Sequence, residues 1–339
     1  MARTYRVGVI GMVHDHVWKE SKLWQACPNV TLAAAADPNE PLRKKMKEPC
    51  GVQVLYADWR EMIEKEDLDI IQLAVENNAG ADVLEAVAPK GLHVISEKPM
   101  AARLEQADRM LKAAEDAGTL LLINWPIAWS PAIRTAARLA KEGAVGRPFH
   151  VRTRMAHCGP KELGCSEYFY GWLYDAEKNG AGALMDYCCY GAAFCRHLLG
   201  MPRAVQGVMG CLVKENFPVD DNAAITMIYD YAFGVAEASW TQIPSYHDTI
   251  ILGSEGTLIT DEGKLWGATK DKKGRFLVEL DPMPEGERNG PEYLLHCLET
   301  GAKPEGMCAA RNCRDAQEIL EAGLISAREG RRIELPINP

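Results

Sequence analysis

The sequence lacks the features that would place the protein on a membrane or on nucleic acid. No apolar stretch approaches the roughly 20 residues that a membrane-spanning helix needs. No apolar leader precedes the first expected strand, which begins at Tyr5. Basic residues are outnumbered 38 to 47, and a formal net charge of −9 disfavours a basic face for nucleic acid or anionic lipid. We therefore expect a cytoplasmic, globular protein with no nucleic-acid partner and no membrane partner.

Cysteine is plentiful, but the spacing typical of zinc sites is missing. The 11 cysteines include no C-x-x-C pair, and Cys188 and Cys189 are adjacent. An odd count in a cytoplasmic chain predicts reduced thiols that pack as small apolar side chains. We expect neither disulfides nor a bound metal.

Internal repeats and low-complexity linkers are also absent, and 339 residues are too many for one ordinary core, so we expect two domains. Up to Asn124, short apolar strands alternate with amphipathic helices. Strands are predicted at 5–10, 31–36, 69–75, 93–95 and 120–123, and helices at 17–26, 81–89 and 104–117. This alternation predicts a doubly wound parallel sheet, a Rossmann fold, in a domain spanning 1–124.

The pattern changes after Asn124. One helix is predicted at 130–142, strands at 147–156, 204–213, 223–231, 234–241 and 248–254, and a last helix at 311–329. Consecutive strands without helices between them favour an antiparallel arrangement. We predict an α/β protein whose second domain, 125–339, is α+β with a large, mainly antiparallel open sheet. A ligand cleft is expected between the two domains.

The first strand leads into a damaged dinucleotide fingerprint. The G-x-G-x-x-G pattern would begin at Gly11, but Val13 and His16 stand where its second and third glycines belong. Asp37, at the end of the second strand, is placed to accept hydrogen bonds from a ribose 2′-hydroxyl, which favours NAD over NADP. An ordinary turn or helix cap is the alternative for Asp37.

Two histidines in the same turn leave another alternative open. His14 and His16 are two residues apart and could ligate a metal from an irregular backbone, but the sequence identifies no third ligand. A helix-capping turn is the favoured interpretation, with Asp15 stabilised by the helix dipole.

The tetrapeptide Ser96-Glu97-Lys98-Pro99 closes an apolar strand. Open α/β sheets place their ligands at the carboxyl ends of the strands, and Lys98 follows such an end directly. The proline favours a rigid turn, which would hold the ammonium group in a cleft. A surface charge is the weaker alternative for Lys98.

These residues together resemble the Gfo/Idh/MocA oxidoreductases, which act mostly on sugars, cyclitols and related polyols. The similar segments are 91–99, 180–186, 251–258 and 330–336, and the resemblance covers the whole chain. Tyr190 stands four residues after Asp186, where most members have histidine. This resembles the subgroup that contains glucose–fructose oxidoreductase and dimeric dihydrodiol dehydrogenase.

The resemblance implies that Lys98, Tyr190 and Asp186 are catalytic. Tyr190 would exchange a proton with the substrate while hydride passes to or from nicotinamide, and Asp186 would orient the substrate hydroxyl or the base. An unperturbed tyrosine pKa near 10 is high for this role, so we expect the Lys98 ammonium to lower it. A core aromatic with a satisfied hydroxyl is the alternative for Tyr190.

The expected cofactor contacts lie along the ends of the Rossmann strands. They are Gly11, Met12, Val13, His14, His16, Asp37, Val75, Asn77, Glu97 and Lys98. Lys98, Asp186 and Tyr190 are also expected to bind substrate, together with Trp125, Tyr168 and Trp172, whose faces could stack on a sugar ring. Packing at the sheet edge or the domain boundary is an equal alternative for the three added aromatics. Glu76 departs from the family pattern, and the sequence suggests no role for it.

The predicted function is that of an NAD-dependent oxidoreductase acting on a secondary hydroxyl or ketone of a sugar, cyclitol or related polyol. One alternative retains NAD and cleaves or isomerises glycosides through transient oxidation. Another is a non-catalytic relative that binds a sugar or a partner. By resemblance, the second domain also mediates assembly, and a homodimer or homotetramer is expected through the outer face of its sheet.

Overall fold

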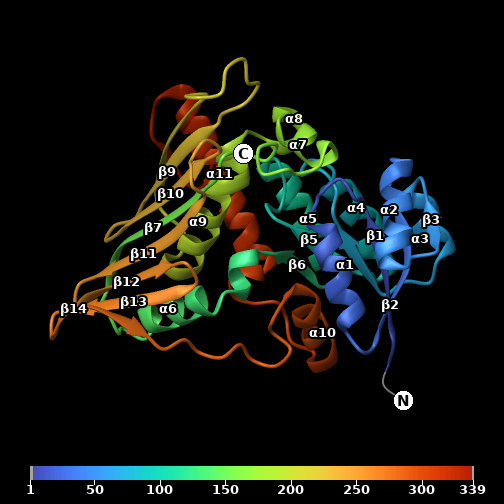
Figure 1. Cartoon of the computed structure of the whole chain (residues 1–339), viewed down its shortest axis with the longest axis horizontal. Coiled ribbons are helices and arrows are strands. Elements are labelled where there is room, and N and C mark those ends of the chain that lie inside the picture. The colour runs from blue at the N-terminus through green and yellow to red at the C-terminus, as the bar shows by residue number, and fades with distance from the viewer. Residues whose placement is uncertain (1–2, 338–339) are drawn as a thin grey trace.

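A computed structural model describes residues 3–337 and shows two lobes, each built on its own sheet (Figure 1). The N-terminal sheet has six parallel strands in the order β3-β2-β1-β4-β5-β6. In chain order they are β1 (Tyr5–Ile10), β2 (Val30–Ala36), β3 (Val54–Tyr56), β4 (Ile70–Leu73), β5 (His93–Glu97) and β6 (Leu121–Asn124). The strand order reverses beside β1, so the ligand crevice of such a sheet is expected at the carboxyl ends of β1 and β4.

Helices connect these strands, as the alternation in the sequence predicts. They are α1 (Val17–Ala26), α2 (Glu40–Cys50), α3 (Trp59–Lys65), α4 (Gly80–Val87) and α5 (Leu104–Ala117), with the short 3-10 helix η1 (Ala88–Lys90). The strands are apolar on both sides because helices cover both faces of a doubly wound sheet. Val7, Val9, Ile70 and Ile71 are accordingly fully buried.

The C-terminal sheet has nine strands in the order β14-β13-β12-β11-β7-β10-β9-β8-β15. They are β7 (Pro148–Ala156), β8 (Ala204–Gly210), β9 (Asn222–Ile228), β10 (Phe233–Ser239), β11 (Tyr246–Gly253), β12 (Gly256–Asp261), β13 (Lys264–Thr269), β14 (Lys272–Val278) and β15 (Ile333–Glu334). Every neighbouring pair is antiparallel except β7 and β10. The predicted fold class, a Rossmann sheet followed by a large, mainly antiparallel sheet, is confirmed.

Two long helices pack against the C-terminal sheet, and α11 runs between the lobes (Figure 1). These are α9 (Ala183–Leu199), which lies on β7 and β10, and α11 (Ala310–Glu329), which lies on β8 and also contacts α5 and β6. Gly191 lets α9 approach the sheet closely, since an added Cβ there would lie 2.5 Å from the Cβ of Ala236. This approach fixes the helix that carries Asp186 and Tyr190.

The remaining helices lie between β6 and β7, between β7 and α9, and between β14 and α11. They are η2 (Pro126–Trp129), α6 (Pro131–Lys141), α7 (Glu167–Leu173), α8 (Ala176–Asn179), α10 (Gly290–Thr300) and η3 (Gly306–Cys308). Although α10 comes late in the chain, it packs against α1, β5 and β6 of the N-terminal sheet. All 11 cysteines are free, as predicted. Among the described helices, none combines the length and the apolar character needed to cross a membrane.

Candidate active site

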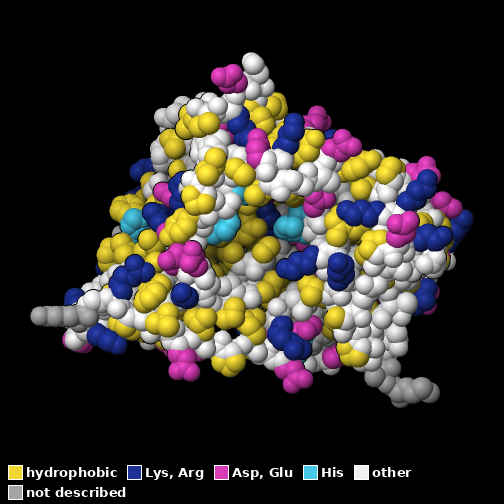
Figure 2. All heavy atoms as spheres, in the orientation of Figure 1, with side chains coloured by type: hydrophobic (Ala, Val, Ile, Leu, Met, Phe, Trp, Pro, Cys, Tyr) yellow, Lys and Arg dark blue, Asp and Glu magenta, His cyan; other side chains and the backbone are white. Residues whose placement is uncertain are grey.

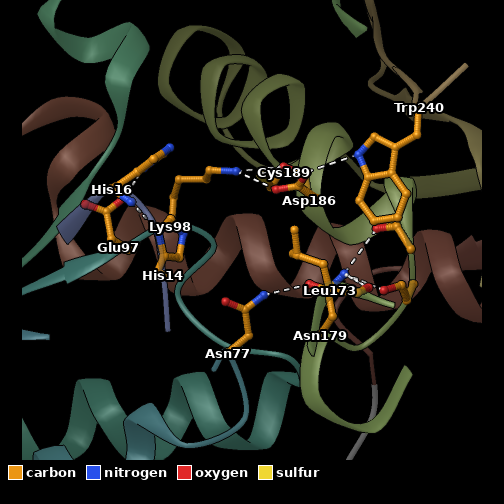
Figure 3. A network of polar contacts seen from close by, with 12 residues as sticks. His14, His16, Asn77, Glu97, Lys98, Leu173, Asn179, Asp186, Cys189 and Trp240 are labelled. Carbon is orange, nitrogen blue, oxygen red and sulfur yellow. Dashed lines mark hydrogen bonds and ion pairs between the residues drawn. The ribbon is translucent and has the colours of Figure 1, made fainter. Parts of the chain in front are cut away.

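A buried ion pair joins the two domains at the carboxyl end of β5. Lys98 Nζ donates to Asp186 Oδ1 at 2.7 Å and to the Asp186 backbone carbonyl at 3.1 Å (Figure 3). Trp240 Nε1 donates to the other carboxylate oxygen at 3.2 Å. Burial alone would lower the pKa of Lys98, but the charges of Asp186, Tyr190 and Cys189 raise it well above its usual value. Lys98 is therefore a fixed ammonium at the cleft, which rules out the surface-charge alternative.

Tyr190 lies one helical turn after Asp186 and packs beside the same ammonium. Lys98 Nζ is 4.7 Å from the centre of the Tyr190 ring, and Tyr190 is 7% exposed. Burial raises the pKa of the Tyr190 phenol, and the Lys98 charge opposes that rise without overcoming it. The expectation of a lowered pKa was wrong because desolvation of the phenolate outweighs the nearby cation. At neutral pH Tyr190 is thus a neutral phenol.

Tyr187 packs edge-on against Tyr190, and His157 packs edge-on against Tyr187. Tyr187 was not among the residues expected in the site. The His157 and Tyr187 rings are 4.7 Å apart, and the Tyr187 and Tyr190 rings are 5.8 Å apart. His157 Nδ1 accepts a hydrogen bond from the Gly159 amide at 2.8 Å, and burial lowers the pKa of His157 to about 4. The sequence gives one indication for His157, which is its position directly after the strand that reaches the cleft.

The turn after β1 retains one feature of a dinucleotide fingerprint. Gly11 has φ +79°, and an added Cβ would lie 2.5 Å from Val75 Cγ1 and 2.7 Å from the Ala74 carbonyl oxygen. The turn therefore needs glycine at this position, for both its backbone angle and the close approach to β4. Met12 and Val13 are buried and not open toward the cleft.

Helix α7 packs against this turn from the C-terminal domain. Trp172 Nε1 donates to the Val13 carbonyl at 3.3 Å, and the Phe169 ring lies 4.5 Å from that of His14. The Ser166 amide and hydroxyl both donate to the Asp15 carboxylate at 2.7 Å. Trp172 thus covers the dinucleotide turn, and with 3% exposure it offers no free face for a sugar ring.

Asp37 lies where the sequence places it, but its carboxylate is already bonded. Oδ2 accepts from the Met12 amide at 2.6 Å, and Oδ1 accepts from the Asn39 amide at 2.7 Å. Burial raises the pKa of Asp37, although the hydrogen bonds from these donors act to lower it. Arg43, which sequence analysis missed, donates to the Asp37 carbonyl at 2.6 Å and lies at the ribose end of the expected cofactor path.

The loop after β4 connects the two domains. Asn77 Nδ2 donates to Asn179 Oδ1 at 2.8 Å (Figure 3). Lys178 Nζ lies 3.2 Å from Glu76 Oε1. Asn179 in turn donates to the Leu173 and Ala181 carbonyls. Glu76 therefore has a structural role as an interdomain ion pair, and Asn77 is turned toward α8.

Among the expected substrate residues, Trp125 is not open to the cleft. Trp125 is 1% exposed, donates to Cys313 Sγ at 3.3 Å and packs edge-on behind Tyr190 at 5.6 Å. It supports the tyrosine from the core side, so the packing alternative holds for Trp125. Tyr168 is partly buried against the hydrophobic core. Figure 2 shows a hollow between the lobes with histidine side chains at its edge.

The close contact at Gly11 gives a test of the turn. Gly11→Ala should lower the free energy of unfolding by about 3 kcal/mol or more, because a left-handed backbone angle and a steric clash add together. Gly91→Ala is the matched control: Gly91 has φ +80° and no atom within 4 Å of an added Cβ. It should cost only about 1–2 kcal/mol. Urea unfolding of both variants measures the difference, and equal costs would contradict the close approach of β4.

Comparison with known proteins agrees with this architecture. The family model described as "Oxidoreductase family, NAD-binding Rossmann fold" matches residues 5–125, and the GFO/IDH/MocA C-terminal domain matches residues 133–259. D-apiose dehydrogenase of Paraburkholderia graminis is 24% identical over 97% of this chain and 88% of its own length. scyllo-Inositol 2-dehydrogenase (NAD(+)) of Bacillus subtilis is 22% identical over 94% of this chain and 97% of its own.

A solved structure shows the same fold across both domains. Levoglucosan dehydrogenase in complex with NADH and levoglucosan superposes with a TM-score of 0.84 at 21% identity, covering 98% of this chain and 100% of that one. The family models together cover well over half of the sequence, and both lobes match. The chain is therefore a member of the Gfo/Idh/MocA oxidoreductase family, with an NAD-binding Rossmann domain and the family's C-terminal domain.

Proposed function

We propose that the protein is an NAD-dependent dehydrogenase that transfers hydride between nicotinamide and a secondary hydroxyl or ketone of a sugar, cyclitol or related polyol. The observation that carries this proposal is the buried Lys98–Asp186 pair with Tyr190 beside it, at the ligand edge of the Rossmann sheet. Relatives named as apiose, inositol and levoglucosan dehydrogenases support the substrate class.

The residues present fit NAD at both ends of its expected path. Gly11 supplies the sharp turn after β1, and Asp37 supplies a carboxylate at the end of β2. At the other end, Glu97 is the last residue of β5 and Lys98 follows it, where the nicotinamide and substrate would meet. Arg43 beside Asp37 makes NADP the second choice to test, since an arginine there can accommodate a 2′-phosphate.

The proton transfer follows from the contacts of Tyr190. When bound, NAD supplies the hydride acceptor for the carbinol C–H. As the alcohol is oxidised, its O–H proton passes to a protein group, and in the reverse direction that group returns the proton to the new alkoxide. Tyr190 is the proposed group, and the Lys98 ammonium stabilises negative charge on the phenolate or the substrate oxygen. Asp186 holds Lys98 in place through two contacts.

Nucleotide binding gives the direct test. Native mass spectrometry of freshly purified protein, followed by calorimetric titration with NAD and NADP, should show binding of NAD and weaker binding of NADP. A panel of pentoses, hexoses and inositols with NAD should then give NADH absorbance for at least one member. NAD retained through purification would instead favour the glycoside-cleaving or isomerising alternative, and no binding of either nucleotide would refute the dehydrogenase proposal.

We also propose that the chain forms a homodimer or homotetramer in the cytoplasm. The C-terminal sheet carries large apolar side chains that are more than two-fifths exposed, among them Phe149, Val208, Phe233 and Leu277. Phe149 and Phe233 lie on the neighbouring strands β7 and β10, and exposed apolar side chains grouped in this way favour a protein partner. Light scattering of the purified protein measures the assembly.

A further inference from the structure

Two histidines and a glutamate meet at the carboxyl ends of β1 and β5. One nitrogen of His14, one nitrogen of His16 and one carboxylate oxygen of Glu97 all lie within 4.8 Å of one another (Figure 3). His16 Nδ1 is 2.9 Å from Glu97 Oε2. The third ligand that the sequence did not identify is therefore Glu97, which lies 81 residues further along the chain.

The three side chains have the chemistry of metal ligands. His14 is 2% exposed, so its imidazole is held inside the cluster. Within residues 3–337 that ring makes one hydrogen bond, a long one of 3.3 Å from the His16 amide. Asn124 Nδ2 donates to Glu97 Oε1 at 2.9 Å and so orients the other carboxylate oxygen toward the histidines. Two imidazoles and one carboxylate are a common donor set for zinc and non-haem iron.

Glu20 is a second, independent indication of a cation at this place. It lies on α1 one turn after His16 and is 5% exposed. Its Oε2 is buried and has no hydrogen-bond partner among the described residues. A buried carboxylate oxygen without a donor is costly, and a cation close to it would reduce that cost.

The nearby positive charge does not prevent ligation. The Lys98 ammonium acts on His14, but it is paired with Asp186 at 2.7 Å and points toward the C-terminal domain (Figure 3). Ligand atoms on a tetrahedral ion at about 2.1 Å lie roughly 3.4 Å apart. His16 Nδ1 and Glu97 Oε2, at 2.9 Å, would have to separate slightly, and any pair near the 4.8 Å limit would have to approach. His16 can supply that movement, because its side chain is 37% exposed.

We propose that His14, His16 and Glu97 bind a divalent late transition-metal ion such as Zn²⁺, with Glu20 as a supporting carboxylate. The donor set leaves one position of a tetrahedral ion open. The ion would lie beside the turn that lost two glycines and would add positive charge there. The proposal does not rest on the dehydrogenase function, since binding is measured without nucleotide or substrate.

Metal content and calorimetry test the site in the full-length protein. Metal-stripped protein titrated with Zn²⁺ should bind one equivalent, and Co²⁺ should give the visible absorption of a four- or five-coordinate ion. Loss of an outer-shell partner already costs about 10–100-fold in affinity. His16→Gln should therefore weaken Zn²⁺ binding by at least ~100-fold, and so should Glu97→Gln.

His296→Gln is the matched control, because His296 is a partly buried histidine on α10 outside the cluster. It should leave Zn²⁺ binding unchanged. Circular dichroism checks that each variant folds, and His16→Gln is the safer one because His16 is partly exposed. The absence of one-equivalent Zn²⁺ binding in the wild type would overturn the proposal. Binding that survives both His16→Gln and Glu97→Gln would overturn it as well.

Discussion

Lys98→Ala is expected to abolish turnover, lowering kcat/KM by at least ~1000-fold with any sugar or polyol that the wild type oxidises. Within residues 3–337, Lys98 is the one buried ammonium that faces Asp186 and Tyr190 together, and it is the cation that acts on the Tyr190 phenol. Steady-state rates of NADH formation measure the effect. The loss should appear in kcat as well as in KM, because the charge is needed most when the substrate oxygen becomes negative.

A loss of fold has to be separated from a loss of chemistry. Removing Lys98 leaves the Asp186 carboxylate buried and unpaired, which typically costs about 3–5 kcal/mol. The double variant Lys98→Ala/Asp186→Asn removes that charge and should recover stability without recovering activity. Lys112→Ala, which breaks an exposed ion pair with Asp116, is the control for lysine removal and should be neutral. A folded Lys98 variant with near wild-type rates would exclude the proposed role.

The fold was predictable where the sequence had long periodic segments. The alternation of apolar strands and helices up to Asn124 and the five longer strands of the second domain are all present. Strands β3, β12 to β14 and β15 were missed, because β3 and β15 have three and two residues and the other three carry polar or exposed side chains over much of their length. The short helices α3, α7 and α8 were missed for the same reason of length. Helices α2 and α10 were missed although each has 11 residues, and α2 carries a proline inside the helix.

The candidate site was predictable only in part. A lysine at the end of a buried strand and the Asp186–Tyr190 spacing identified the residues that the structure brings together. Contacts between distant segments had no local signal: Glu97 with His16, Asn77 with Asn179, and Trp172 with Val13. Each joins residues more than 80 positions apart, so only the three-dimensional structure could pair them. Periodicity also does not tell a core tryptophan such as Trp125 from one that lines a cleft, which is why both alternatives stayed open for the aromatic residues.

The pKa of Tyr190 leads to a prediction about pH. Burial raises it above the ordinary value of about 10, so at neutral pH the phenol carries its proton. Alcohol oxidation needs the deprotonated form to accept the substrate proton, and its rate should therefore rise as pH increases from neutral into the alkaline range. Ketone reduction needs the protonated form, which predominates over this whole range because the pKa lies above 10, so its rate should stay nearly constant there. A pH profile measured in both directions checks the sign.

Tyr190→Phe should remove this pH dependence and lower the rate by at least ~100-fold, the usual scale for loss of a general acid–base group. The ring still packs against Trp125, so the fold should be retained. Tyr187→Phe is the matched control, since Tyr187 lies on the same helix, 5.6 Å from the same ammonium, and is not the proposed proton acceptor.

A loss of only a few-fold at Tyr190 would move the proton transfer to Lys98 or to His157. His157 is neutral at pH 7 because burial lowers its pKa to about 4, so it could accept a proton there. In that case His157→Gln, and not Tyr190→Phe, would carry the larger loss.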